Sequence, residues 1–546
     1  MLTKPVDTPQ DVARKLSLGR GAVVAIVIFV ALFATHFPLL DLPYFWDEAG
    51  YYIPAAHDLY TTGALIPHST LTDAHPPLVM IYLAAAWKFF FYSPEITRCA
   101  MLLIATFTLL AVYALAARVS GRSVATASVI CTALFPVFFS QSAMAHLDMT
   151  AACFMLWGLY YYLAERRIAA VALFALACLA KETAVLAPLS LFAWEWAVHL
   201  LKSRRTRVGA VFANFPQCGS LDSFALLLSL VPLIGWFGFH YARTGHVFGN
   251  PEFFRYNLGS TLNPLRFLAA LALRAWHLFG YMNMALLTAA AAIAMLLQPR
   301  REKDGSERRP IVPAVQGVFY ALIVVHILAL AVLGGAVLAR YLVPVYPLVM
   351  IVGVATLRRR LPMWPVAVAI VCAGFVLALV RNPPYRFAPE DNLAWTDYVR
   401  LHKSADSFVA RRFPEGPVLT AWPASDELTR PALGYVVYAP VPIVRIENFS
   451  AEQILGAADE RGRYRAALVF STKYEPRYLL RIPGWERLQE RFFGYHRDLP
   501  PELIARMLGG RIVFEQHRRE QWVAVIAIDT IESAKVEGAP GPGSGR

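Results

Sequence analysis

The sequence predicts an all-α polytopic membrane bundle followed by a small α/β domain. Of the 546 residues, 57% are hydrophobic and 16% are charged, and the mean hydropathy is +0.47. Soluble domains carry about 25% charged residues, so the chain is predicted to cross a membrane many times. Apolar runs fill residues 1–380, whereas 381–535 is polar and predicts a separate domain. The tail 536–546 is rich in Gly and Pro and is predicted to be disordered.

Basic loops set the predicted topology. The first apolar run, 21–40, follows a basic stretch and lacks a small-residue cleavage site, so we interpret it as an uncleaved first span. Many of the basic residues behind the net charge of +13 lie in short loops between later apolar runs, which is the positive-inside pattern and argues against a nucleic-acid partner. The loops that we place in the cytoplasm, together with the N-terminus, are Arg118–Arg122, Glu165–Arg167, Lys202–Arg207, Arg300–Arg309 and Arg358–Arg360.

This arrangement predicts about eleven transmembrane helices. The stretch 78–92 is short for a span and contains Lys88, so we expect it to lie in the membrane interface. The region 41–95 then forms one external loop with two interfacial helical pieces, and the C-terminal domain lies on the external, periplasmic side of the inner membrane. The predicted spans are 21–40, 97–117, 123–139, 149–164, 168–182, 184–200, 222–240, 267–297, 311–333, 341–356 and 362–380.

The polar segment after the last span shows alternating strand and helix patterns. It predicts short strands at 418–422, 466–470, 511–514 and 523–528, with helices at 425–435 and 451–459. None of the six cysteines lies in this domain, and the chain has no metal-type cysteine spacing. Neither a disulfide nor a cysteine-bound metal is therefore predicted there.

An acidic pair, Asp47–Glu48, follows the first membrane-length apolar run and is set among aromatic residues. Carboxylates at a membrane surface are costly without a partner, which suggests a site that handles a proton or a polar substrate. The alternative is structural, because an Asp before a helix commonly caps its free N–H groups. On these two residues alone, both interpretations stand.

Other polar residues fall at the same external level in the predicted topology. Each alone could be a helix cap, a headgroup anchor, a local ion pair or a turn residue. Together they predict a polar cavity between the helices. These residues are Asp148, Lys181, Glu182, Arg340, His75 and, in the loop 241–266, Arg255 and Asn257.

Such a cavity suits group transfer from a lipid-linked phosphate donor. A carboxylate can accept the proton of an attacking hydroxyl, and Arg and Lys can hold the phosphate and stabilise the charge that develops as it leaves. An apolar wall between helices can hold a polyprenyl tail. The sequence contains neither a GxxxxGK[ST] phosphate loop nor a GxGxxG placed after a strand, which argues against a nucleotide-sugar donor.

With these residues in view, the chain resembles the GT-C-fold membrane glycosyltransferases, specifically the protein O-mannosyltransferases and bacterial aminoarabinose transferases (glycosyltransferase family 39/83-like). The resemblance covers roughly residues 20–380, and it rests on the order of the motifs rather than on any one of them. The matching pieces are Trp46–Tyr51, His75–Leu78, Arg98, Arg118–Arg122, Ala145–Asp148, Leu179–Glu182, Thr244–Asn250 and Arg340–Pro344.

The resemblance implies an inverting transfer of a sugar from a polyprenyl-phosphate carrier to a protein, lipid or cell-envelope glycan on the external face. The first-loop acidic residue of the family falls on Asp47, its second-loop acidic residue on Asp148, and its basic residue after the fifth span on Lys181. Relatives often have Gly where Glu182 follows here, and this departure adds charge near the site.

In the leading hypothesis, Asp47 is the base that activates the acceptor hydroxyl and Glu48 helps to position the sugar or the acceptor. Asp148 orients the acceptor or shares the base role. His75 contacts phosphate or a divalent cation; no spacing requires a metal, so no cofactor is predicted and a divalent metal is left open. The residues expected to contact donor phosphate or substrate are Lys181, Arg255, Arg340, His75, Tyr51, Asn257 and Glu182.

Two other functions are compatible with an apolar bundle that carries external charges. A transporter or flippase of lipid-linked sugars would usually show internal repeats and polar residues near mid-membrane, whereas this chain shows no repeat and its charges lie at the ends of spans. A non-catalytic membrane anchor for 381–535 would leave the gathered carboxylates unexplained. The glycosyltransferase is therefore the favoured prediction, with a polyprenyl-phosphate sugar, an acceptor and membrane lipid as its partners.

Overall fold

The computed structural model describes residues 18–203, 220–249, 263–302, 304–333, 335–437, 440–476 and 483–528. The chain forms two compact units. The first, the helical unit, consists of residues up to 40 together with 54–381 and 390–392. The second, the sheet unit, consists of 41–53, 382–389 and the residues from 393 onward. The predicted loop 41–95 is thus divided between the two units.

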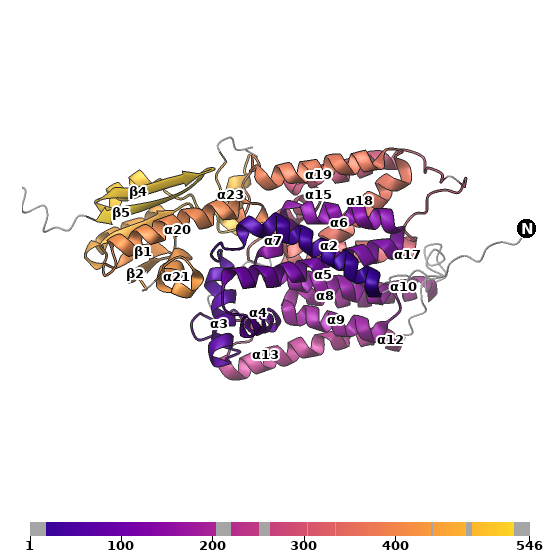
Figure 1. The fold of residues 1–546 in the computed structure, drawn as a ribbon, viewed down its shortest axis with the longest axis horizontal. Helices are drawn as coiled ribbons and strands as arrows, with labels where there is room; N and C mark the ends of the chain where they lie inside the picture. Colours follow the sequence, from indigo (N-terminus) through magenta and orange to yellow (C-terminus); the bar gives the residue numbers. More distant parts are fainter. Residues whose placement is uncertain are drawn as a thin grey trace, which may run out of the picture. The chain divides into compact units, whose positions relative to one another are not determined.

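The helical unit is a bundle of apolar helices, and a helix lies at each of the eleven predicted spans (Figure 1). Helix α5 packs against both α6 and α8, and α8 packs against α9. The helices are α2 Leu18–His36, α3 Ile53–Thr62, α4 Leu78–Phe89, α5 Pro94–Ser120, α6 Arg122–Leu134, α7 Pro136–Ala143, α8 Leu147–Leu163, α9 Arg167–Ala180, α10 Leu186–Ser203, α12 Ser220–Phe224, α13 Val231–Thr244, α15 Pro264–Phe279, α16 Met284–Met295, α17 Pro313–Val332, α18 Tyr346–Arg360 and α19 Trp364–Val380.

Helix α5 shows how the local sequence sets the length of a long span. The Ser93 hydroxyl accepts a hydrogen bond from the Ile96 N–H at 3.3 Å, and Pro94 occupies the first turn, where its missing N–H costs nothing. The helix ends at Gly121, which has a φ of +87° that other residues rarely adopt. These two signals enclose a 27-residue helix.

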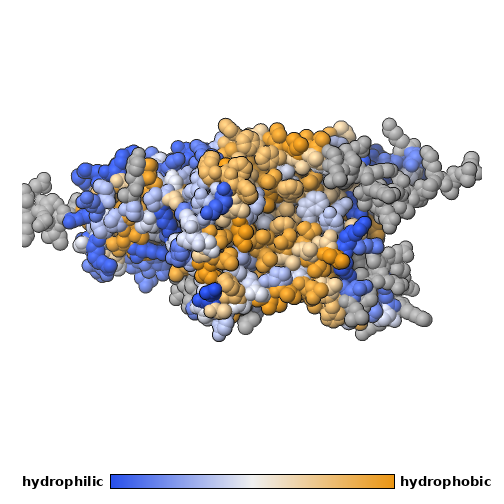
Figure 2. Space-filling model, turned by 60° about the horizontal axis from the view of Figure 1, so that its bottom comes forward, coloured by the Kyte–Doolittle hydropathy of each residue, from blue (hydrophilic) through white to orange (hydrophobic). Residues whose placement is uncertain are grey.

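The chain is a multi-pass membrane protein. Among the described residues, six helical segments are long and apolar enough to cross a membrane, or seven if α6 and α7, bent by 71°, form one span. This is fewer than the eleven expected, because α8, α9, α18 and α19 have 17, 14, 15 and 17 residues and are too short for that criterion. Figure 2 shows a broad hydrophobic surface over the helical unit, as expected for lipid contact.

The sheet unit is built on a five-stranded mixed sheet with the order β2-β1-β3-β5-β4. β2, β1 and β3 are parallel, whereas β5 is antiparallel to both β3 and β4. Every residue of β3 is buried, so this central strand forms the core of the sheet. The strands are β1 Val418–Ala421, β2 Ile443–Ile446, β3 Ala466–Phe470, β4 Gly510–Arg518 and β5 Gln521–Ile528.

Helices cover this sheet, and α20 packs against β4 and β5. Strands lie at the four predicted positions, whereas β2 and the long helix α20 were not predicted. The segment 41–53 also packs into the unit, because the Tyr435 hydroxyl donates to the Tyr44 carbonyl at 2.8 Å. The helices are α20 Ala394–Arg412, α21 Ala424–Thr429, α22 Ala451–Asp459, α23 Trp485–Phe492 and α24 Pro501–Leu508.

Candidate functional site

A buried ion pair joins the ends of two helices in the helical unit. Helix α8 begins directly after His146, so Asp148 lies in its first turn. Helix α9 ends at Ala180, and the chain continues in extended conformation through Lys181. The Lys181 ammonium donates to Asp148 Oδ1 at 2.7 Å, and the two side chains are 5% and 4% exposed. Because an unpaired buried charge is strongly destabilising, loss of either residue leaves the other without its partner.

Arg340 extends this pair into a network. It lies on the short helix η6, Ala339–Leu342, and its side chain is 2% exposed. Its Nε is 3.7 Å from Asp148 Oδ2, and its Nη1 is 3.2 Å from Glu390 Oε2. The same Nη1 lies 3.0 Å from each ring nitrogen of His146, while His146 Nδ1 lies 2.7 Å from the Gln141 amide oxygen. This arrangement fits a neutral His146 that donates through Nδ1 and accepts from Arg340 through Nε2.

Three cations lie close to the ring of Tyr341. The Lys181 Nζ lies 4.0 Å from the ring centroid, and the guanidinium carbons of Arg274 and Arg340 lie 5.5 Å and 5.7 Å from it. Such contacts stabilise cations that are removed from water. Three cations therefore lie around one aromatic ring, an arrangement that suits the binding of an anion.

A second polar group lies beside the first, because Glu182 follows Lys181 in the chain. The His75 Nδ1–H donates to Glu182 Oε2 at 2.8 Å, and His75 Nε2 is 3.9 Å from Asp73 Oδ2. Burial lowers the pKa of His75, but the two carboxylates outweigh burial and raise this pKa to about 9. His75 is therefore an imidazolium at neutral pH, which suits contact with an anion better than with a metal ion.

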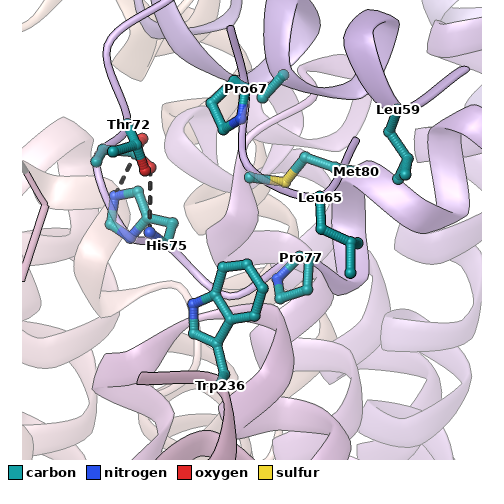
Figure 3. Close-up of a pocket in the computed structure, with 10 residues that line it drawn as sticks. Leu59, Leu65, Pro67, Thr72, His75, Pro77, Met80 and Trp236 are labelled. Atoms are coloured by element: carbon teal, nitrogen blue, oxygen red, sulfur yellow. Dashed lines mark hydrogen bonds and ion pairs between the residues drawn. The ribbon is translucent and has the colours of Figure 1, made fainter. Parts of the chain in front are cut away.

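A small pocket opens beside His75 (Figure 3). The Trp236 ring borders it, and the Trp236 indole N–H donates to the Ala74 carbonyl at 2.9 Å. The Thr72 hydroxyl, also in the lining, is 2.9 Å from His240 Nε2. These bonds fix the loop that carries His75 against α13, so the imidazolium is held in place at the wall of the pocket.

The acidic pair Asp47–Glu48 belongs to the sheet unit, where the two side chains differ in burial and in hydrogen bonding. Glu48 is fully buried, and its Oε2 accepts a hydrogen bond from the Phe45 N–H at 2.9 Å. Asp47 is half-buried and precedes the π-helix Glu48–Tyr52 without forming a side-chain cap hydrogen bond. Glu48 thus binds the backbone that precedes the π-helix rather than the free N–H groups of the helix itself. Single π-helical turns of this kind are frequent at functional sites.

The described structure brings together Asp148, Lys181 and Arg340 in one network, with His75 and Glu182 as the neighbouring pair. Asp47, Glu48 and Tyr51 lie in the sheet unit, where the Tyr51 ring is 5.9 Å from that of Trp422. Two predicted site residues, Arg255 and Asn257, lie outside the described residues.

Sequence reasoning missed several members of the network. Two of them could have been found from the sequence, because His146 lies two residues before Asp148 and Tyr341 lies directly after Arg340. Arg274 is in the interior of an apolar helix, where a charged residue is itself a signal of function. Glu390 follows the last span in a polar stretch, and nothing local marks it as a partner of Arg340.

Comparison with known proteins gives a family match and several similar folds. Residues 74–231 match the family model described as dolichyl-phosphate-mannose-protein mannosyltransferase. ArnT from Cupriavidus metallidurans in the apo state is 16% identical, with a TM-score of 0.50 over 93% of this chain and 98% of that chain. The same protein bound to undecaprenyl phosphate gives a TM-score of 0.47 at 16% identity, over 93% and 97% of the two chains.

Arabinofuranosyltransferase AftD from Mycobacteria is 14% identical, with a TM-score of 0.43 over 94% of this chain and 40% of that chain. The comparison with curated protein sequences gives no match. At these identities the apo ArnT structure shows a shared fold, and the family match over residues 74–231 adds the activity class. Together they confirm the predicted resemblance to the GT-C membrane glycosyltransferases: residues 74–231 match the protein mannosyltransferase model, and the chain shares the fold of ArnT.

Proposed function

We propose that the protein transfers a sugar from a polyprenyl-phosphate carrier to an acceptor on the external, periplasmic face, with inversion at the anomeric carbon. The observation that carries this proposal is the buried network of Lys181, Asp148 and Arg340. The family match supports the donor class, because the family is described by a polyprenyl-phosphate-linked sugar. The external side follows from the basic loops that the positive-inside rule assigns to the cytoplasm.

The cations around Tyr341 are the proposed site for the donor phosphate. Lys181, Arg274 and Arg340 lie together around this ring, and their positive charges suit a phosphate group. When the bond between the anomeric carbon and the phosphate oxygen breaks, negative charge grows on the phosphate. Fixed cations stabilise that charge more in this buried site than water would. The imidazolium of His75 adds a further positive charge to the same region.

The proposed base is Asp47, by the family resemblance. The acceptor hydroxyl gives its proton to the carboxylate of Asp47 as its oxygen attacks the anomeric carbon on the face opposite the phosphate. One carbon–oxygen bond forms as the other breaks, so the configuration inverts and the polyprenyl phosphate leaves. Asp47 forms no side-chain cap bond. Asp148 is bound by two cations, and we assign it the role of fixing Lys181 and Arg340.

Transfer from defined donors tests this proposal. The full-length protein, purified in detergent, is incubated with polyprenyl-phosphate-linked mannose, aminoarabinose or arabinofuranose and with envelope lipids, glycans or proteins as acceptors. We expect release of polyprenyl phosphate with one donor, and an anomeric configuration opposite to that of the donor in the product. Activity with nucleotide sugars and with none of the lipid-linked donors would contradict the proposal.

A matched control separates loss of the site from loss of the fold. Arg167 and Glu195 form another ion pair in the helical unit, with a 2.8 Å contact and a Glu195 side chain that is 1% exposed. We expect Glu195→Gln to reduce stability and leave transfer intact in the protein that stays folded. We expect Lys181→Met to abolish transfer.

A further inference from the structure

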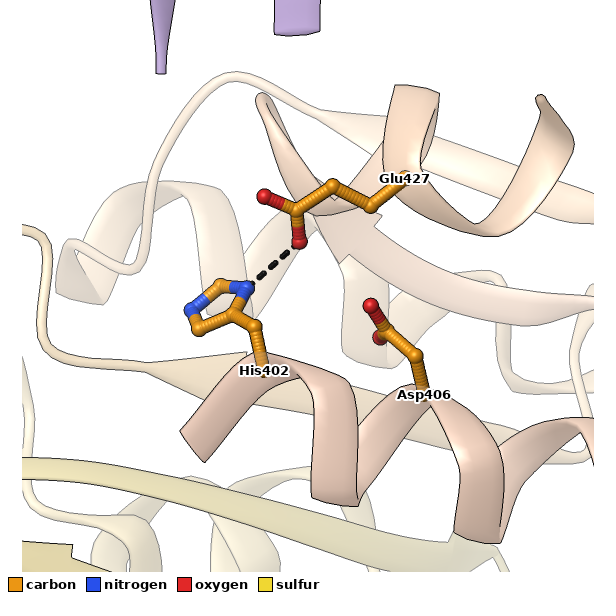
Figure 4. A group of neighbouring side chains, drawn as sticks. All are labelled: His402, Asp406 and Glu427. Carbon is orange, nitrogen blue, oxygen red and sulfur yellow. Dashed lines mark hydrogen bonds and ion pairs between the residues drawn. The ribbon is translucent and has the colours of Figure 1, made fainter. Parts of the chain in front are cut away.

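Three buried polar side chains meet inside the sheet unit, apart from every residue used above (Figure 4). His402 and Asp406 lie four residues apart on α20, so both point to the same face of this helix. Glu427 comes from α21, which follows strand β1 and packs against α20. All three residues are between 0% and 1% exposed.

The polar atoms of this group are poorly satisfied by the protein. The His402 Nδ1–H donates to Glu427 Oε2 at 2.6 Å. Within the described part of the chain, both carboxylate oxygens of Asp406, Oε1 of Glu427 and Nε2 of His402 have no hydrogen-bond partner. A buried polar group without a partner costs about 1–3 kcal/mol, and more if it is charged, so the three carboxylate oxygens without a partner in this cluster call for a ligand.

We propose that His402, Asp406 and Glu427 bind a divalent transition-metal ion, such as Zn²⁺ or Mn²⁺, that ties α20 to α21. One imidazole nitrogen and two carboxylates form a donor set that such ions accept. Two carboxylates and a neutral imidazole also balance the charge of a divalent cation, which removes the cost of burying the carboxylates alone.

The geometry is close to that of a metal site. One donor atom from each residue lies within 4.8 Å of the others. Bonds of about 2.0–2.2 Å to a shared ion place donors up to about 4 Å apart, so a small inward movement of the side chains completes the site. Figure 4 shows both carboxylates turned toward the Nδ1 edge of His402. Binding through Nδ1 requires the other tautomer of the neutral imidazole, so its single proton moves from Nδ1 to Nε2.

The surroundings favour a structural rather than a catalytic ion. The Tyr398 ring stacks on His402 with centroids 3.8 Å apart, and the Phe470 ring contacts it edge-on at 4.5 Å. These rings exclude water from the group.

The test uses the full-length protein in detergent with its purification tag removed. The protein is stripped with a chelator and then dialysed against Zn²⁺, Mn²⁺ or Mg²⁺ separately. Bound metal is measured by mass spectrometry, and the melting temperature by intrinsic fluorescence. We expect close to one Zn²⁺ or Mn²⁺ per chain and a higher melting temperature with that ion. Asp406→Asn and His402→Gln should each lower the affinity at least about tenfold, since even the loss of a group that supports a ligand costs this much.

Another His–Glu pair provides the control. His517 and Glu515 on β4 are 2.7 Å apart but exposed, and Glu515→Gln should leave metal content unchanged. Two results would overturn the proposal: a wild-type protein that binds no ion and melts at the same temperature with or without metal, or equal metal content in wild type and Asp406→Asn. Because the wild-type measurement needs no variant, the proposal stays testable even if Asp406→Asn fails to fold. It also holds or fails independently of sugar transfer.

Discussion

Replacing Lys181 with Met removes a charge that has two roles, one in stability and one in the proposed reaction. For stability, loss of one partner from a buried ion pair costs about 3–5 kcal/mol. We expect a value near 3 kcal/mol, because Arg340 Nε stays 3.7 Å from Asp148 Oδ2 and still balances part of its charge. For catalysis, loss of one group that stabilises developing charge lowers kcat by about 10²–10³-fold. The single variant should therefore be both less stable and nearly inactive.

The double variant Lys181→Met, Asp148→Asn separates the two effects. It removes the unpaired carboxylate as well, so most of the lost stability should return, as the melting temperature in detergent reports. Transfer from the lipid-linked donor should stay low, because the cation that faces the phosphate is still missing. If the double variant recovers both stability and transfer to within about tenfold of wild type, Lys181 serves only to neutralise Asp148 and the phosphate assignment is wrong.

Three further predictions follow from single side chains. Asp47→Asn should abolish transfer without lowering the melting temperature, and an active variant would remove the proposed base. His75 has a pKa of about 9, above its ordinary 6.5. Its ion pairs should therefore stabilise the protein fully below about pH 6.5, and this stabilisation of about 3 kcal/mol should be lost as the pH rises through 9. If the pH dependence of the melting temperature is the same in His75→Gln as in wild type, this prediction is wrong. Gly50→Ala places a Cβ 2.6 Å from the Trp422 ring and should cost about 1–3 kcal/mol in thermal unfolding, whereas Gly456→Ala, with open space around it, should cost nothing.

The helical bundle was predictable because apolar length and basic loops are properties of the sequence alone. The membrane forces each span to satisfy its own backbone hydrogen bonds, so a long apolar run has to be helical. The number of spans was harder to predict. α9 and α18 have only 14 and 15 residues, and the length criterion does not settle whether such helices cross a membrane.

The sheet unit was only partly predictable. Strands β1, β3 and β5 are largely buried and apolar, and β1 and β5 are rich in β-branched residues, so their pattern is clear. Strand β2 has four residues, includes the exposed Arg445 and lies at the edge of the sheet, which leaves almost no local signal. Helix α20 does carry an amphipathic pattern, but many charged residues on its outer face make the stretch look like a polar linker.

The candidate site shows the same division between local and long-range information. The predicted order and direction of the spans were enough to place Asp148, Lys181 and Arg340 at one membrane level, and the structure brings them into contact. The partner Glu390 lies 50 residues beyond Arg340 in the chain, after the last span. Only tertiary packing selects this carboxylate from the others of the polar segment, so no reading of one sequence could identify it.

The pair Asp47–Glu48 shows why two adjacent acidic residues need different explanations. A carboxylate that accepts a backbone N–H three residues earlier is bound to its own turn, and this is the state of the fully buried Glu48. Its charge is used to fix the bend between Phe45 and the π-helix, so exchange of this residue should first affect folding. Asp47 is more exposed and has no such cap bond. The base is assigned to Asp47 by the family resemblance, and the structural role is assigned to Glu48 by its bond to the Phe45 N–H.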